Sequence, residues 1–162
     1  MVIQRIPMTP KGLKDVKEEL EQLIKVERKS IVSAISEARE HGDLKENAEY
    51  HAAKEKQGMV EAKIRMLEQK VSAVQVIDVS IMSPEVYKVI FGSTVTISDD
   101  DTGNESCYKI VGEDEADFNK NMISVSSPLS RGLIGRQEGD EVRVRMPNGK
   151  ELVYSILKVE YI

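Results

Sequence analysis

The chain has 162 residues, enough for one ordinary domain or two small ones, and its 40% apolar and 31% charged residues are typical of a soluble protein. Aromatic residues make up only 4% and tryptophan is absent, which disfavours a ligand pocket lined by aromatic rings. The net charge of −5 lies in residues 79–162, and residues 1–78 are balanced, so there is no basic excess to support binding of nucleic acid without a protein partner.

The chain carries no sign of membrane insertion or export. No apolar run approaches the roughly 20 residues of a membrane span, and the N-terminal residues lack the apolar core of a signal peptide. The single cysteine, Cys107, cannot form an internal disulfide. We therefore expect a cytoplasmic protein without a membrane partner.

The first predicted element is a long amphipathic helix. Thr9 suits the capping position and Pro10 the first helical position. Apolar residues then follow a three–four spacing at Leu13, Val16, Leu20 and Leu23. Glu27 falls on this seam, and the apolar pattern continues one position later at Ile24, Ile31, Ile35 and Ala38.

A second helical pattern follows Gly42, which interrupts the first. Its seam alternates by three and four throughout, at Tyr50, Ala53, Gln57, Val60, Ile64, Leu67, Val71 and Val74. Two such helices joined by a few residues run antiparallel, so residues 1–78 are predicted to form an antiparallel coiled-coil hairpin. A hairpin of this kind is also what a dimerisation or scaffolding module would contain.

From about Val76 the apolar period changes to two, which predicts strands. The predicted strands cover 95–97, 108–111, 122–125, 142–145 and 152–156, and a short helix is predicted to begin at Ser127-Pro128 and to end near Gly132 or Gly135. Residues 79–162 should therefore form a small, mainly antiparallel sheet domain with one short helix. The fold class predicted for the whole chain is α+β.

Two acidic residues, Asp43 and Glu46, lie at the turn of the hairpin, and their spacing admits three interpretations. Asp43 could cap the second helix, with Glu46 completing a capping box. Together with His41 and His51 the acids could form a metal site of the chain's own, although the spacing is poor for one. Alternatively, they could be donated to a magnesium site in another macromolecule, because Mg²⁺ is often held by one or two protein carboxylates plus phosphates.

Several long strings of the sequence resemble one family. They are residues 37–53 around Gly42-Asp43-Leu44-Lys45-Glu46-Asn47, residues 89–95 (Val-Ile-Phe-Gly-Ser-Thr-Val), residues 110–112 and 114–118, and residues 127–135 (Ser-Pro-Leu-Ser-Arg-Gly-Leu-Ile-Gly). On these strings the chain is similar to the bacterial Gre transcript cleavage factors, a family of transcription elongation factors. The resemblance runs from Ile6 to Tyr161.

The resemblance implies a coiled-coil hairpin that enters the secondary channel of RNA polymerase and an FKBP-like globular domain that holds the channel rim. Asp43 and Glu46 match the family's tip acids, which help bind the second Mg²⁺ and the attacking water when the polymerase cleaves backtracked RNA. The factor itself is then not an enzyme and binds no cofactor alone. Arg39 and Lys54 match a basic patch that faces the RNA 3′ end, although Arg is common at the second position. A solvated helix face is the alternative for both.

The contact with the polymerase rim is less well defined by the sequence. The segment 127–135 is our candidate for part of it, with Ser127, Pro128, Arg131 and Gly132 as the contacting residues, but the same segment could simply close the core of the sheet.

The acidic balance and the matched strings favour the GreA branch of the family over GreB. The intact tip argues against the anti-cleavage relatives, and the sparse aromatic set argues against a prolyl isomerase. We expect a monomer.

Overall fold

The computed structural model describes residues 4–43 and 47–162. The chain forms two compact units, each considered by itself. The hairpin unit contains Leu13–Val74, and the globular unit contains Arg5–Gly12 together with Gln75–Ile162. A single cut after residue 78, as predicted from the sequence, assigns the segment 5–12 and residues 75–78 differently from this division. The α+β fold class is confirmed.

The first arm of the hairpin is helical from Pro10 to Glu40. It comprises α1 (Pro10–Gln22), the π-helical turn η1 (Leu23–Glu27) and α2 (Arg28–Glu40). The predicted start is confirmed, because the hydroxyl oxygen Oγ1 of Thr9 accepts a hydrogen bond from the Gly12 amide at 3.1 Å.

The π-helical turn explains why the apolar seam of this arm shifts by one position. A π-turn accommodates one more residue than an α-helical turn does before the chain returns to the same face. Leu23 before the shift and Ile31 after it are both buried in one apolar cluster, although their spacing breaks the three–four rule. Glu27, which the uninterrupted seam would bury, is only half-buried.

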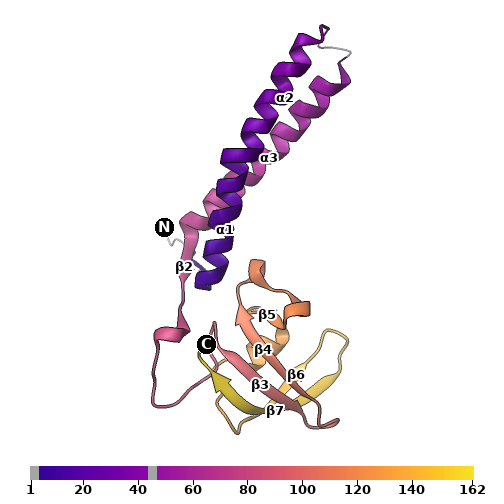
Figure 1. The fold of residues 1–162 in the computed structure, drawn as a ribbon. Helices are drawn as coiled ribbons and strands as arrows, with labels where there is room; N and C mark the ends of the chain where they lie inside the picture. The colour runs from indigo at the N-terminus through magenta and orange to yellow at the C-terminus, as the bar shows by residue number, and fades with distance from the viewer. Residues whose placement is uncertain (1–3, 44–46) are drawn as a thin grey trace. The chain divides into compact units, whose positions relative to one another are not determined.

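The second arm is α3 (Ala48–Ala73), which runs beside α2 in the opposite direction (Figure 1). The predicted seam of this arm is confirmed, since all eight of its positions are buried or half-buried. The buried cluster between the arms consists of Leu23, Ile31, Val60, Ile64 and Leu67. Only Val74 departs from the predicted helix, since it begins a strand.

Several ion pairs link the arms, and the one between Arg28 and Glu61 has two hydrogen bonds. The Arg28 guanidinium donates from Nε to Glu61 Oε1 at 2.7 Å and from Nη2 to Glu61 Oε2 at 2.9 Å. These hydrogen bonds hold the pKa of Glu61 below its ordinary value.

The start of the second arm differs from the capping interpretation of the two tip acids. The capping residue of α3 is Asn47, whose side-chain oxygen accepts a hydrogen bond from the Tyr50 amide at 3.1 Å. Asp43 therefore does not cap this helix, which begins five residues after it, at Ala48. Glu46, the other member of the proposed capping box, lies outside the described residues.

The globular unit is built on one five-stranded sheet of order β5-β4-β3-β7-β6. Its strands are β3 (Thr94–Asp99), β4 (Glu105–Val111), β5 (Met122–Ser124), β6 (Glu141–Arg145) and β7 (Glu151–Glu160). Each contains residues of a predicted strand, and three of the four pairings are antiparallel. The sheet is nevertheless mixed rather than purely antiparallel, because β5 lies parallel to β4.

The core of this unit lies between the sheet and a short helix. Helix α4 (Pro128–Leu133) has the predicted bounds and packs on β6, and Leu133 is fully buried there. Ten buried residues form the core cluster: Val89, Val95, Ile97, Ile110, Ile123, Leu133, Val142, Val144, Ile156 and Val159. The sequence analysis did not predict the short paired strands β1 (Ile6–Met8) and β2 (Val74–Val76). It also missed the single 3₁₀ turns η2 (Val79–Ile81), η3 (Glu113–Glu115) and η4 (Phe118–Lys120).

Candidate functional site

The candidate site is the tip of the hairpin, where α2 ends and α3 begins. Helix α2 ends at Glu40, and the amides of His41 and Gly42 donate to the carbonyls of Ala38 and Arg39 at 3.3 and 3.4 Å. Gly42 has a φ of +108°, a conformation that a residue with a Cβ rarely adopts, so the glycine lets the chain leave the helix here. Asp43 follows directly and is exposed.

The far side of the tip is held by Asn47. Its side-chain oxygen caps α3, and its Nδ2 donates to the main-chain carbonyl of Ala38 in the last turn of α2 at 2.5 Å. One side chain thus bonds to both arms. Sequence reasoning missed this residue because the acidic pair offered a competing capping box. The available signal was an asparagine three positions before Tyr50, the first residue of the second seam.

The two histidines of the tip contact other partners. His41 Nε2 lies 3.8 Å from Glu49 Oε2, so this exposed pair joins the two arms. The His51 ring lies edge-on to Tyr50, its neighbour in the chain, at 5.7 Å between ring centroids. Within residues 4–43 and 47–162, no three His, Cys, Asp or Glu side chains come close enough to hold a metal ion. This gives no support to a metal site belonging to the chain alone, although Glu46 is outside those residues.

Arg39 and Lys54, the predicted basic patch, come together on the hairpin. They line one depression of about 260 Å³ between α2 and α3, together with Val32, Ile35, Ser36 and Gln57. Lys54 Nζ donates to Gln57 Oε1 at 3.2 Å, and both basic residues are exposed. The depression therefore presents two cations beside the aliphatic side chains of Val32 and Ile35, and cations of this kind can bind a phosphate group.

The four residues predicted to contact a polymerase belong to α4 and its cap. Ser127 caps the helix by accepting from the Ser130 amide at 3.2 Å, and Pro128 occupies its first turn. A Cβ on Gly132 would lie 3.0 Å from Val144 Cγ2, so the glycine allows α4 to pack closely on β6. Gly132 and Ser127 thus have structural roles, whereas Pro128 and Arg131 are exposed and available for contact.

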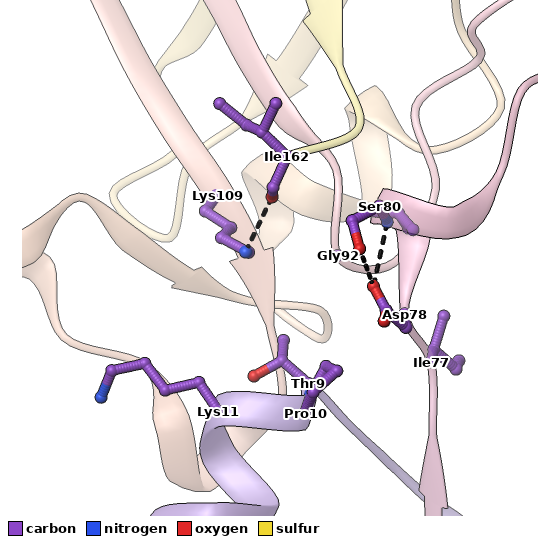
Figure 2. A pocket seen from close by; sticks show the side chains of 10 residues that line it. Thr9, Pro10, Lys11, Ile77, Asp78, Ser80, Gly92, Lys109 and Ile162 are labelled. Carbon is purple, nitrogen blue, oxygen red and sulfur yellow. Dashed lines mark hydrogen bonds between the residues drawn. The ribbon is translucent and has the colours of Figure 1, made fainter.

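A second depression, of about 250 Å³, lies in the globular unit beside the start of α1 (Figure 2). Lys109 Nζ donates to the Ile162 carbonyl at 3.0 Å, and Asp78 accepts from the amide and hydroxyl of Ser80. These polar groups bond to one another within the protein. None of the residues predicted to be functional lines this depression.

The sequence was compared with known families and proteins. Residues 6–76 match the family described as "Transcription elongation factor, N-terminal", and residues 83–161 match "Transcription elongation factor, GreA/GreB, C-term". The chain belongs to the GreA/GreB family of transcription elongation factors. It is 53% identical over 161 residues to the transcription elongation factors GreA of Francisella tularensis subsp. novicida and subsp. tularensis, covering 99% of both chains in each comparison.

Solved structures of this family also resemble the chain. The GreA factor homolog 1 (Gfh1) of Thermus thermophilus is 23% identical with a TM-score of 0.43, covering 97% of this chain and 99% of its own. The GreA/GreB factor of Nitrosomonas europaea is 20% identical with a TM-score of 0.42, covering 97% of this chain and 100% of its own.

No helix in the described part of the chain is long and apolar enough to cross a membrane.

Proposed function

We propose that this elongation factor stimulates the RNA cleavage activity of RNA polymerase by donating the carboxylates of Asp43 and Glu46 to the polymerase active site. The hairpin enters the secondary channel, and the two acids help hold the second Mg²⁺ and orient the attacking water. The polymerase then cuts backtracked RNA and resumes elongation from the new 3′ end. The factor acts in the cytoplasm as a monomer and is not itself a nuclease.

The observation that carries this proposal is the position of Asp43. It is exposed and follows Gly42, three residues after α2 ends at Glu40, in a family of elongation factors. A lone carboxylate in water binds Mg²⁺ weakly, because the ion keeps most of its own waters. The acids are therefore suited to completing a site that another macromolecule supplies.

The decisive experiment uses a stalled, backtracked elongation complex with Mg²⁺ and saturating factor. Asp43→Asn and Glu46→Gln should each reduce the cleavage rate to nearly that of polymerase alone, while competition binding to the polymerase stays as in the wild type. Glu40→Gln, which removes an exposed carboxylate three residues from Asp43, is the matched control and should retain full stimulation. Full stimulation by both tip variants, or cleavage of RNA by the factor alone, contradicts the proposal.

We further propose that Arg39 and Lys54 bind the RNA 3′ end in the shared depression. Arg39→Ala and Lys54→Ala should lower crosslinking of the factor to the RNA 3′ end more than they lower polymerase binding. Lys54→Arg should preserve the crosslink, since a guanidinium can bind phosphate with two hydrogen bonds. Lys29→Ala removes an exposed cation elsewhere on α2 and should leave crosslinking unchanged. Equal losses of crosslinking and polymerase binding would contradict an RNA-specific role.

A further inference from the structure

The tip end of the hairpin is held together by little apolar burial. No side chain of residues 48–59 is buried, and the buried residues of α3 begin only at Val60. On the other arm, the buried residue nearest the tip is Ala38, which has a small side chain. Apolar packing therefore cannot by itself fix the two helix ends relative to each other, and polar contacts must do so.

Asn47 supplies two of these polar contacts with one planar group. Its oxygen accepts from the Tyr50 amide at 3.1 Å in α3, and its nitrogen donates at 2.5 Å to the carbonyl of Ala38 in α2. Ala38 is only 1% exposed, so the bond from Asn47 is made to a buried residue of α2. The Asn47 side chain has two rotatable bonds, χ1 and χ2. Hydrogen bonds at both ends of its amide plane fix both torsions.

In the sequence, each tip acid is next to a residue that is hydrogen-bonded to a helix: Asp43 follows Gly42, and Glu46 precedes Asn47. Gly42 is held by its amide bond to the Arg39 carbonyl, and Asn47 is held to both arms. Four residues separate them in the chain, and Asp43 is the first of the four and Glu46 the last. Gly42 and Asn47 are therefore the described residues that flank the two acids in the chain.

We propose that Asn47 is a positioning residue for cleavage: its bridge from α3 to the Ala38 carbonyl fixes the two helix ends relative to each other, and the two donated carboxylates lie between those ends in the chain. This inference rests on the proposed function of Asp43 and Glu46. Asn47 does not touch the metal or the RNA itself. It acts by holding the ends of the two helices in one arrangement before the tip meets the polymerase site. Less conformational entropy is then lost when the complex forms.

The two hydrogen bonds of Asn47 can be separated by substitution. Serine and aspartate are both good capping residues and can still accept from the Tyr50 amide. Neither can make the second bond, because the serine hydroxyl is too short to reach Ala38 and a carboxylate has no hydrogen to donate. Asn47→Ser is neutral, whereas Asn47→Asp adds a negative charge beside the acids. Agreement between the two variants thus separates loss of the bridge from a change in charge.

The test measures cleavage in backtracked elongation complexes as a function of both factor and Mg²⁺ concentration. For Asn47→Ser and Asn47→Asp we expect the rate at saturating factor to fall roughly ten- to a hundredfold, the size of effect that misplaced catalytic groups produce. The factor concentration for half-maximal stimulation should stay within about twofold, and the Mg²⁺ concentration for half-maximal rate should rise. Helix content by circular dichroism should match the wild type, because the cap is kept.

Asp43→Asn is measured alongside to separate this inference from the proposed function. If Asp43→Asn is inactive while Asn47→Ser keeps the wild-type rate and Mg²⁺ dependence, the positioning role is overturned and the donated acids stand. If only Asn47→Asp is slow, charge rather than the bridge is responsible, and the positioning role is again overturned. If Asp43→Asn keeps full stimulation, the proposed function fails and this inference fails with it.

Discussion

The two units of this protein place their buried residues very differently. The globular unit encloses ten core residues that are at most 8% exposed, and its functional candidates, Pro128 and Arg131, lie on a helix packed over that core. In the hairpin unit, the buried cluster between the arms contains five residues and extends no nearer to the tip than Ile31 and Val60, whereas the functional candidates of this unit lie nearer to the tip in the sequence. The comparison teaches that the buried apolar clusters lie away from the tip of the hairpin. At the tip, hydrogen bonds of Asn47 connect the two helices.

The largest expected effect compares the same substitution in each unit. Ile110→Ala removes a fully buried side chain from the sheet core and should cost about 2–5 kcal/mol of unfolding free energy in the globular unit. Ile64→Ala should cost less, because only one helix faces it and the seam can partly close. Hydrogen exchange of amides in β4 and α3 measures the two units separately. Equal loss of protection in both units for either variant would show that they unfold together.

The next test sharpens the description of the hairpin seam by deleting single residues. Deleting exposed Val26 from η1 should remove the extra residue of the π-turn and leave Leu23, Ile31 and Ile35 on one continuous three–four seam. Stability and helix content should then stay near the wild type in thermal denaturation followed by circular dichroism.

Deleting exposed Ser33 is the matched control for the Val26 deletion. If the π-turn stays, Ile35 and Ala38 rotate off the seam by about 100°. If the π-turn instead becomes α-helical, Ile31 leaves the seam. We expect a loss of roughly 2–4 kcal/mol, comparable to removing one buried aliphatic side chain. Equal effects of the two deletions would show that η1 does not absorb the shift.

A smaller effect is expected where a carboxylate holds Thr9, the residue that caps α1. Glu115 Oε2 accepts from the Gly112 amide at 2.9 Å and from the Thr9 amide at 3.2 Å, and Oε1 accepts from the Thr9 hydroxyl. Glu115→Ala leaves these donors without their partner and should cost about 1–3 kcal/mol, measured as a lower thermal midpoint and faster exchange of both amides. Glu113→Ala, on the same 3₁₀ turn but exposed, should change neither.

The smallest expected effect is the pH dependence of the Arg28–Glu61 pair. Because Arg28 lowers the pKa of Glu61 in the folded chain, the pair stabilises the hairpin above the ordinary carboxyl pKa of 4.5. This contribution is lost as pH falls through the lowered pKa. The difference in thermal midpoint between the wild type and Glu61→Gln should therefore be constant near neutral pH and shrink in acid. A difference that grows in acid would contradict this sign.

Sequence reasoning succeeded where one pattern dominated and failed where two patterns competed. The Thr9-Pro10 helix start, the seam of α3 and the bounds of α4 follow from local chemistry and periodicity, and all are confirmed. The shift at Glu27 was visible in the sequence, but its cause, a π-turn, depends on packing against the second arm. Asp43 resembled a cap because capping and metal binding use the same residue type, and only the structure assigns the cap to Asn47.

The remaining differences arise from contacts distant in sequence. The strands β1 and β2 are only three residues each, too short for an alternating pattern to be recognised. The parallel pairing of β5 with β4 depends on how the chain between them crosses, which the strand sequence does not encode. Glu115 accepts hydrogen bonds from Thr9, which lies 106 residues earlier, and no local signal connects the two.

The strand order of the sheet has a consequence for how the protein behaves at high concentration. One outer strand, β5, has three residues, and the other, β6, alternates buried valines with the exposed charged side chains of Glu141, Arg143 and Arg145. Neither outer strand is a good template for pairing with a strand of another molecule. Strand β5 is too short, and the charged side chains of β6 disfavour such pairing. The sheet is thereby protected against aggregation by strand addition without any covering subunit.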